Sequence, residues 1–394
     1  MLVLRTSWVF SLITAISFVA TVTSQCSNIA VRKEIRELST QERQDFIDAV
    51  LAINTINGTQ GRSTTYATLS QVHVDYFSEA HGTASFFPWH RRYLRNFEIE
   101  LQKIKPNVVI PYWDWSIDSQ DPASSEVFYS NFFGGNGSGN NSCVPNGPFK
   151  NWDVYIPSRH CLQRNFNRRG NISSFFSPEA LSAIIRGSKN YADLADQIES
   201  PPHGTVHVGI GGDMSRTYSS NDPLFWLHHA FVDKIWADWQ AMHPSRAYSY
   251  GGTNAQGEEA QLDDMMNPFN TQVFTVMSTT TTGLCYRYSN GPKNRNKRQQ
   301  LESMDNEDDY KLIIPDPLTE EHIMMNNGDV SAVREKEKFL ADVVTLYNLL
   351  PNYISPVSPA RRPDTMQKLE RGELGNLLLK IPAMEIRKIQ TEPF

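Results

Sequence analysis

The placement of histidines in apolar segments constrains the fold of this 394-residue chain more than any other feature. The stretch HGTASFFPWHRRYL, residues 81–94, sets His81 and His90 among apolar and aromatic residues. A buried imidazole without a partner costs free energy, so a fold that buries these rings has to satisfy their nitrogens. These histidines therefore indicate either hydrogen-bonded core residues or metal ligands.

Apolar residues recur at helical spacing in four parts of the chain, which predicts helices over residues 40–53, 67–80, 89–101 and 223–240. His73 and His90 fall on the inward stripes of two of these helices, and His81 lies on the loop between them. One such residue alone would be best explained as a core histidine. Three together favour a metal site.

A second group of histidines lies further along the chain. In PPHGTVHVGIGG, His203 and His207 are four residues apart, so on a helix they share one face and can hold one metal ion. In NDPLFWLHHAFVDKIWADW, His228 and His229 point about 100° apart, and periodicity alone does not choose between them. Asp233, one turn after His229, is expected to orient that ring through its other nitrogen.

Inward-facing ligands on several helices are a known way to build a dinuclear site in a bundle core. The sequence therefore predicts a mainly α fold, in which a central four-helix bundle holds a dinuclear site, with long loops, minor β structure and a C-terminal extension. Imidazole ligands suit zinc, copper, iron or nickel, so the ligand type leaves the metal open.

Four regions follow from composition. Residues 1–24 are expected to be a secretory signal peptide, because Arg5 precedes an apolar run over Trp8–Ala20 and small residues follow. Residues 25–290 form the histidine-rich core, residues 291–299 a basic linker, and residues 300–394 the extension. The linker contains R-N-K-R (Arg295–Arg298), which resembles a proprotein-convertase site, although a solvated charge run is the alternative.

A secreted, extracellular location agrees with two further features. The four cysteines are expected to be oxidised; Cys143–Cys161 and Cys26–Cys285 are the favoured pairs, although the sequence leaves the pairing open. Sequons for N-glycosylation occur at Asn57, Asn136, Asn140 and Asn171. The net charge of −6 gives no sign of a nucleic-acid partner, and no later stretch is long and apolar enough to predict a membrane span.

Several motifs together resemble those of the type-3 copper family of tyrosinases, catechol oxidases and molluscan-type haemocyanins. They are H-x7-H-x8-H ending in FFPWHRRYL, P-Y-W-D-W, H-x3-H and D-P-L-F-W-L-H-H-A-F-V-D, within about residues 30–290. The resemblance implies two copper ions and dioxygen as co-substrate. It assigns His73, His81 and His90 to the first copper and His203, His207 and His229 to the second, with His228 behind the ligands. His160, His243 and His322 have no matching role.

The resemblance also implies a substrate pocket. Phe225 is expected near the copper pair, Thr217 at the substrate mouth and Met214 nearby, although simple packing is the alternative for each. Glu199 matches a glutamate that holds a catalytic water in related oxidases, and the alternative is an exposed surface glutamate. Gly204 stands where several efficient tyrosinases have Asn, which favours oxidation of diphenols over hydroxylation of monophenols.

The expected function is a secreted dicopper oxidase. It would convert o-diphenols, and secondarily monophenols or protein tyrosines, to o-quinones for pigment formation or matrix cross-linking. A haemocyanin-like oxygen carrier and a non-catalytic matrix protein with the same fold are the alternatives. Residues 299–394 fit an extension that covers the pocket until it is cleaved. The oligomeric state stays open.

Overall fold

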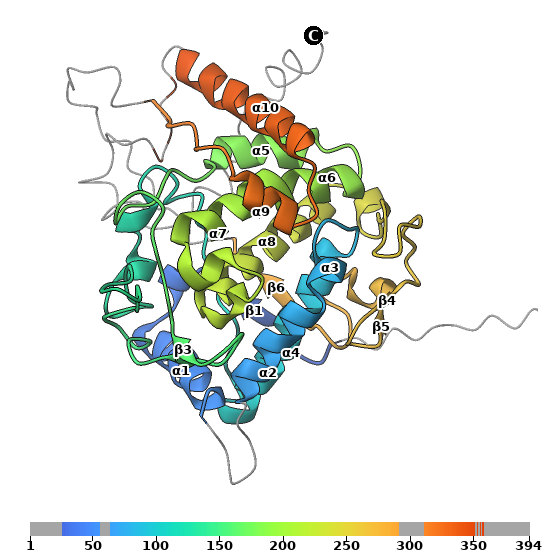
Figure 1. Cartoon of the computed structure of the whole chain (residues 1–394). Coiled ribbons are helices and arrows are strands. Elements are labelled where there is room, and N and C mark those ends of the chain that lie inside the picture. The colour runs from blue at the N-terminus through green and yellow to red at the C-terminus, as the bar shows by residue number, and fades with distance from the viewer. Residues whose placement is uncertain are drawn as a thin grey trace, which may run out of the picture.

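The computed structural model describes residues 26–55, 64–290 and 311–350, together with residues 353, 355 and 357. Most of its regular structure is helical (Figure 1), which confirms the mainly α prediction. The helices are α1 (Thr40–Ile53), α2 (Thr65–Asp75), α3 (Phe77–Ala80), α4 (Phe86–Ile104), α5 (Pro178–Gly187), α6 (Tyr191–Ile198), α7 (Gly204–Ile210), α8 (Leu224–Ala241), α9 (Glu320–Met325) and α10 (Val330–Leu349).

The first predicted helix forms as expected because its start is well capped. The Ser39 hydroxyl accepts a hydrogen bond from the Glu42 backbone N–H at 3.2 Å, and the Glu42 carboxylate accepts one from the Ser39 N–H at 2.8 Å. This reciprocal pairing satisfies two backbone donors that the helix itself leaves free. The inward face of α1 then buries Phe46, Ile47 and Val50.

The prediction of one continuous helix over residues 67–80 is wrong, because the helix is interrupted in its middle. The backbone leaves helical geometry at Tyr76 (φ −112°, ψ 20°), so that α2 ends and the short α3 follows. His81 comes directly after α3. The break redirects the chain, and as a result the Nε2 atoms of His81 and His73 lie 3.2 Å apart.

Helices α4 and α8 pack together at the centre of the molecule (Figure 1). Large aromatic rings fill their contact: Phe97 of α4 stacks on Trp226 of α8 with ring centres 3.8 Å apart, and Phe87 stacks on Trp236 at 5.5 Å. Such rings bury much apolar surface and fix the relative position of the two helices. Nearly every side chain of α8 up to Trp236 is buried, as the run of apolar residues predicts.

The strands are short and pair in twos. β1 (Ala30–Arg32) pairs in parallel with β6 (Tyr286–Tyr288), while β2 (Asp153–Val154) pairs with β3 (His160–Cys161) and β4 (Met265–Met266) with β5 (Thr271–Gln272), both antiparallel. The β1–β6 pair brings together the two ends of the core. The disulfide Cys26–Cys285 joins these ends covalently, and Cys143–Cys161 is the second disulfide, so both favoured pairings are confirmed.

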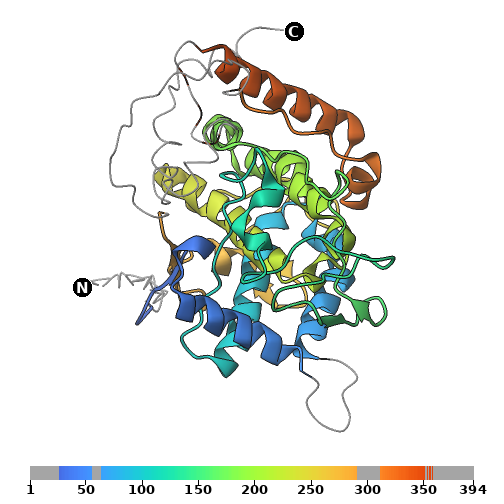
Figure 2. The ribbon, with the colours of Figure 1, turned by 90° about the vertical axis from the view of Figure 1, so that its left-hand side faces the viewer.

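The C-terminal segment packs on the core. α10 lies along the top of the molecule next to α5, and α9 lies close to α7 (Figures 1 and 2). Lys336 of α10 pairs with Asp196 at 2.5 Å, and Arg168 of the core pairs with Asp316 at 2.6 Å. Helix α10 is therefore held against the core by a face of buried apolar residues, which belongs to the main hydrophobic cluster, and by ion pairs at the surface.

Several sequence predictions concern residues outside the described ranges: the signal peptide 1–24, Asn57 and the linker 291–299. Of the other sequons, Asn140 and Asn171 are exposed, whereas Asn136 is partly buried and its side-chain oxygen accepts a hydrogen bond from the Phe166 N–H at 2.9 Å.

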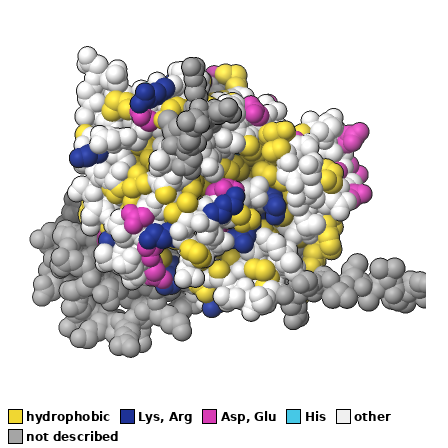
Figure 3. Space-filling view, turned by 90° about the horizontal axis from the view of Figure 1, so that it is seen from below, with side chains coloured by type: hydrophobic (Ala, Val, Ile, Leu, Met, Phe, Trp, Pro, Cys, Tyr) yellow, Lys and Arg dark blue, Asp and Glu magenta, His cyan; other side chains and the backbone are white. Residues whose placement is uncertain are grey.

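The described surface has mixed charge. On the face seen from below, Lys and Arg side chains lie interspersed with Asp and Glu side chains and hydrophobic ones (Figure 3). Among the described helices, none is both long and apolar enough to cross a membrane.

Candidate metal centre

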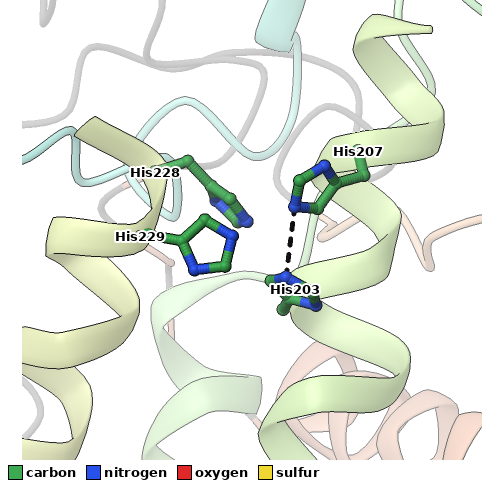
Figure 4. A group of neighbouring side chains, drawn as sticks. All are labelled: His203, His207, His228 and His229. Atoms are coloured by element: carbon green, nitrogen blue, oxygen red, sulfur yellow. Dashed lines mark hydrogen bonds between the residues drawn. The ribbon is translucent and has the colours of Figure 1, made fainter. Parts of the chain in front are cut away.

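Seven buried histidines form two groups at the centre of the bundle. His73, His81 and His90 make the first group; His203, His207, His228 and His229 make the second (Figure 4). Within each group the candidate ligand nitrogens lie within 4.8 Å of one another. The rings come from α2, the residue after α3, α4, the π-helical turn Glu199–His203, α7 and α8. The predicted convergence of histidines is therefore confirmed.

Most of these rings are oriented by a hydrogen bond at Nδ1. The acceptors are backbone carbonyl oxygens of Thr217 for His73 (2.8 Å), Phe86 for His90 (2.8 Å), Glu199 for His203 (3.1 Å) and Met214 for His207 (2.7 Å). A carbonyl oxygen only accepts, so in each of these rings Nδ1 carries the proton. Nε2 then presents a lone pair, which is the form in which a neutral imidazole binds a metal.

The lone pairs point at one another. Nε2 of His81 lies 3.2 Å from Nε2 of His73, and Nε2 of His207 lies 3.1 Å from Nε2 of His203 (Figure 4). Nε2 of His90 is buried and has no hydrogen-bond partner among the described residues. Facing lone pairs repel unless a cation lies between them, so this arrangement fits a metal ion in each group.

Burial keeps the rings uncharged. Loss of solvent lowers the pKa of His73 from 6.5 to about 3 and that of His207 to about 4. The pKa values of His81, His90, His203 and His229 are also well below 6.5, first because of burial and then because of neighbouring imidazoles. At neutral pH each ring is therefore available as a ligand.

The two groups adjoin and make one centre. The rings of His90 and His229 stack with centres 4.2 Å apart and planes inclined by 10°, and His81 stacks on His203 at 5.8 Å. Glu199 contacts one ring from each group: its Oε1 lies 3.2 Å from Nδ1 of His81, and its carbonyl oxygen accepts from His203. Two facing, buried histidine groups in a helical bundle fit a dinuclear metal centre with imidazole ligands.

Comparison with known proteins identifies the family. Residues 63–242 match the family model described as the common central domain of tyrosinase. The chain is 36% identical over 289 residues to tyrosinase ustQ of Aspergillus flavus, which covers 67% of this chain and 80% of that protein. It is 34% identical over 266 residues to the tyrosinase of Streptomyces glaucescens, covering 61% of this chain and 93% of that one. The chain belongs to the tyrosinase family and is a copper oxidoreductase of the tyrosinase type.

Solved structures agree at the level of the fold. A polyphenol oxidase from Thermothelomyces thermophila superposes with a TM-score of 0.56 at 23% identity, over 66% of this chain and 89% of that one. A tyrosinase from Burkholderia thailandensis gives 0.50 at 18% identity, over 66% and 74%. The family implies a dinuclear copper site, and the facing imidazoles of this chain provide the residues for it.

The second group contains four rings for three expected ligand positions. Both nitrogens of His228 and of His229 lack hydrogen-bond partners among the described residues. His229 lies nearer the first group, against His90, whereas His228 lies 4.7 Å from the ring of His207 and 6.2 Å from Trp115. The position of His229 between the groups is consistent with the ligand role that the family resemblance implies, and that assignment stays a prediction.

Glu199 is buried, so the alternative explanation, that it is an exposed surface glutamate, is wrong. It is 8% exposed, and loss of solvent raises its pKa from 4.5 to about 8. Its Oε1 also accepts a hydrogen bond from the Gly82 N–H at 2.9 Å. These contacts place the carboxyl group where it orients His81, and its predicted role in holding a catalytic water stays a prediction.

Of the expected pocket residues, Phe225 lies beside the centre as predicted. Its ring centre is 4.2 Å from that of His229 and 4.9 Å from that of His73. Met214 and Thr217 contact the centre through their carbonyl oxygens, which hold His207 and His73. The sequence offered no signal for these backbone contacts.

The expected contact between Asp233 and His229 is wrong. Asp233 Oδ1 accepts a hydrogen bond from Arg91 Nε at 2.5 Å, and its Oδ2 accepts from the hydroxyls of Tyr286 (2.5 Å) and Tyr288 (2.6 Å). The carboxylate is therefore turned from the metal centre towards β6. It joins α8 to α4 and to the end of the core.

One histidine without an expected role lies close to the centre. His322 of α9 is 6% exposed, and its ring centre is 6.3 Å from that of His207. A Cβ atom added to Gly204 would lie 2.9 Å from Nε2 of His322. The sequence offered one indication that His322 is buried, namely its apolar neighbours Leu318 and Ile323, which are buried with it.

Proposed function

We propose that this protein oxidises o-diphenols to o-quinones with dioxygen, and monophenols less readily. The paired, uncharged imidazoles whose Nε2 lone pairs face one another carry this proposal. Two copper ions held there supply the binding of dioxygen and the two-electron oxidation of the phenolic ring. Small phenols and catechols are the proposed substrates, with exposed tyrosines of other proteins as a second class.

The residues of the chain prepare the centre for this chemistry. Nδ1 hydrogen bonds fix five rings in position, so little reorganisation is needed when the metal binds or changes charge. Phe86 and Phe225 are fully buried against the rings and exclude water from one side of the centre. Gly204 presents no side chain towards His322, which leaves room for a flat aromatic ring once α9 is displaced.

The C-terminal segment is proposed to be a lid. Close contacts of α9 and the turn after it support this: a Cβ atom on Gly82 would lie 2.7 Å from the Asn326 carbonyl oxygen, and Asn327 Nδ2 donates to the His81 carbonyl at 3.3 Å. His322 lies over Gly204, which the family resemblance places in the substrate pocket. A phenol would have to displace this segment to reach the centre.

Cleavage in the linker is the proposed way to remove the lid. The lid is held by the ion pairs Arg168–Asp316, Arg216–Glu321 and Lys336–Asp196, which lie largely at the surface and are each worth little, and by the buried apolar face of α10. A cut in the linker breaks none of these contacts, but it allows the segment to dissociate from the core. The expected signal peptide, the sequons and the two disulfides support action outside the cell. Pigment formation or cross-linking of an extracellular matrix is the proposed role.

A haemocyanin-like oxygen carrier is the second candidate, because a lid that excludes a phenol still admits dioxygen. One experiment separates the two. The copper-loaded chain, intact and cut after Arg298, is given L-DOPA or tyrosine, and quinone absorbance is followed. The proposed oxidase turns over L-DOPA faster than tyrosine, and faster when cut. Reversible oxygen binding without quinone in both forms would support the carrier instead.

A further inference from the structure

One short segment orients a ring in each half of the metal centre. Residues 212–217 comprise the 3-10 turn η5 (Gly212–Ser215) and the two residues after it. The Met214 carbonyl oxygen accepts from His207 at 2.7 Å, and the Thr217 carbonyl oxygen accepts from His73 at 2.8 Å. A shift of this segment would therefore turn one imidazole of each group at the same time.

Asp213 fastens this segment to its surroundings. Its side chain is fully buried: Oδ2 accepts from the Gln163 N–H at 2.7 Å, and Oδ1 accepts from Asn221 Nδ2 at 3.0 Å and from His160 Nε2 at 2.9 Å. Its own N–H donates to the Gln163 carbonyl at 3.0 Å. The carboxylate thereby joins the segment to residues 160–163 on one side and to η6 (Ser219–Asn221), just before α8, on the other.

Backbone packing leaves the segment no room to move towards residues 163–165. Gly211 and Gly212 have φ of 65° and 58°. A Cβ atom on Gly211 would lie 2.1 Å from the Asn165 carbonyl oxygen, and one on Gly212 would lie 2.2 Å from that of Gln163. Only glycine permits this approach of two backbones at these angles. The Cys143–Cys161 disulfide ties down the same stretch next to His160.

His160 supplies the charge that a buried carboxylate requires. Its Nδ1 lies 2.6 Å from the Ser158 carbonyl oxygen, and its Nε2 lies 2.9 Å from Asp213 Oδ1. Both neighbours are acceptors, so both bonds form only when both ring nitrogens carry protons. The bond to Asp213 raises the pKa of His160 above 6.5, while partial burial opposes the rise. Tyr218 packs edge-on at 6.3 Å, and the nearby ion pair Arg159–Asp153 lies at the surface.

We infer that Asp213, paired with His160, is a positioning residue for both copper ions. It sets the place of the two carbonyl oxygens that orient His207 and His73. The ion pair lies outside the metal centre and contacts no proposed ligand directly, so it acts through the backbone of residues 213–217. This inference depends on the proposed copper centre and adds to it a support that both halves share.

The test is the rate at which copper leaves the full-length protein in the presence of a chelator. We compare the wild-type chain with Asp213→Asn, which keeps the size of the side chain, and with His160→Gln. His243→Gln is the matched control, because His243 is an exposed histidine whose ring hydrogen-bonds to Ser245 and lies outside both histidine groups. Melting of each metal-free protein is measured in parallel, to separate loss of copper from loss of fold.

Asp213→Asn should release copper about tenfold faster or more, since groups that orient metal ligands commonly have effects of this size. Both copper ions should leave together, because a ring in each group is affected. His160→Gln should have a smaller effect, which disappears as the pH rises through the pKa of His160, where the wild-type pair also loses its charge. His243→Gln should match the wild type at every pH.

Two results would overturn the inference. One is a folded Asp213→Asn protein that keeps copper as long as the wild type. The other result applies if Asp213→Asn does not fold. In that case, equal rates of copper release from His160→Gln and His243→Gln at all pH values would overturn the inference. A wild-type chain that takes up no copper would refute the proposed function itself, and this inference with it.

Discussion

The Arg91 guanidinium donates a 2.5 Å hydrogen bond to Asp233 in the middle of the protein, with both side chains fully buried. The same carboxylate accepts from Tyr286 and Tyr288, and Arg91 also donates to the Val276 carbonyl at 3.0 Å. This network joins α4 and α8, which carry histidines of the metal centre, to β6 at the end of the core. It is a structural support rather than part of the centre.

Replacing Asp233 should therefore destabilise the fold. Asp233→Ala leaves a buried Arg91 without its carboxylate, and we expect a loss of about 3–5 kcal/mol in the free energy of unfolding. Urea denaturation of the metal-free protein measures it. Tyr288→Phe removes one hydrogen bond of the same network and should cost only about 1 kcal/mol. Equal losses for the two variants would show that the ion pair stabilises the fold no more than the single hydrogen bond of Tyr288 does.

The two adjacent histidines of α8 should differ in their effect on copper. His229→Ala should lose the second copper ion and retain no more than one per chain, whereas His228→Ala should retain two. Metal analysis after reconstitution gives the stoichiometry, and His243→Ala serves as the control. The opposite result, with copper lost from His228→Ala alone, would reassign the third ligand of the second group.

His322 should limit access in the intact protein. His322→Ala removes the ring that lies over Gly204, so the intact chain should oxidise catechol several-fold faster. After cleavage at Arg298, the variant and the wild type should be equal, because the segment is then free to leave. Met324, which is 61% exposed on the same helix, provides the control variant Met324→Ala. If the intact His322→Ala protein is as slow as the wild type, His322 does not block the site.

The metal-free protein should lose stability as the pH falls below 6.5. The pKa values of the buried imidazoles are lowered in the folded state, to about 3 for His73 and about 4 for His207. Between these values and 6.5 the unfolded chain binds more protons, so the free energy of unfolding decreases as the pH falls, by about 1.4 kcal/mol per pH unit for each such histidine.

Thermal melting of the metal-free protein at pH 7, 6 and 5 checks this, and copper should reduce the dependence because it occupies the same lone pairs. A melting temperature that is constant over this range would contradict the assignment of uncharged rings.

The sequence predicts the helices and the histidines of the centre well, because both depend on local spacing. α1 has the predicted bounds, and His203 and His207 share a face because they are four residues apart. The break at Tyr76 was not predicted, since apolar spacing continues through it and the backbone change depends on packing around His81.

Contacts between distant segments were the part that could not be predicted. Asp233 has helical spacing from His229, but its partner comes from α4, over a hundred residues earlier. The carbonyl oxygens of Met214 and Thr217 have no signature in the sequence at all, because every residue carries the same backbone group. His322 lacked a role for a similar reason: its neighbour Gly204 is close only after the C-terminal segment has folded back.

The disulfide between Cys26 and Cys285 should affect how well the core resists unfolding after proteolysis beyond residue 285. Together with the parallel pairing of β1 and β6, it turns the copper-binding part of the chain into a covalently closed ring whose own ends are locked to each other. After proteolysis at the linker the disulfide would still hold both ends of this ring together, so the freed core should resist unfolding from its ends for longer than the segment it sheds.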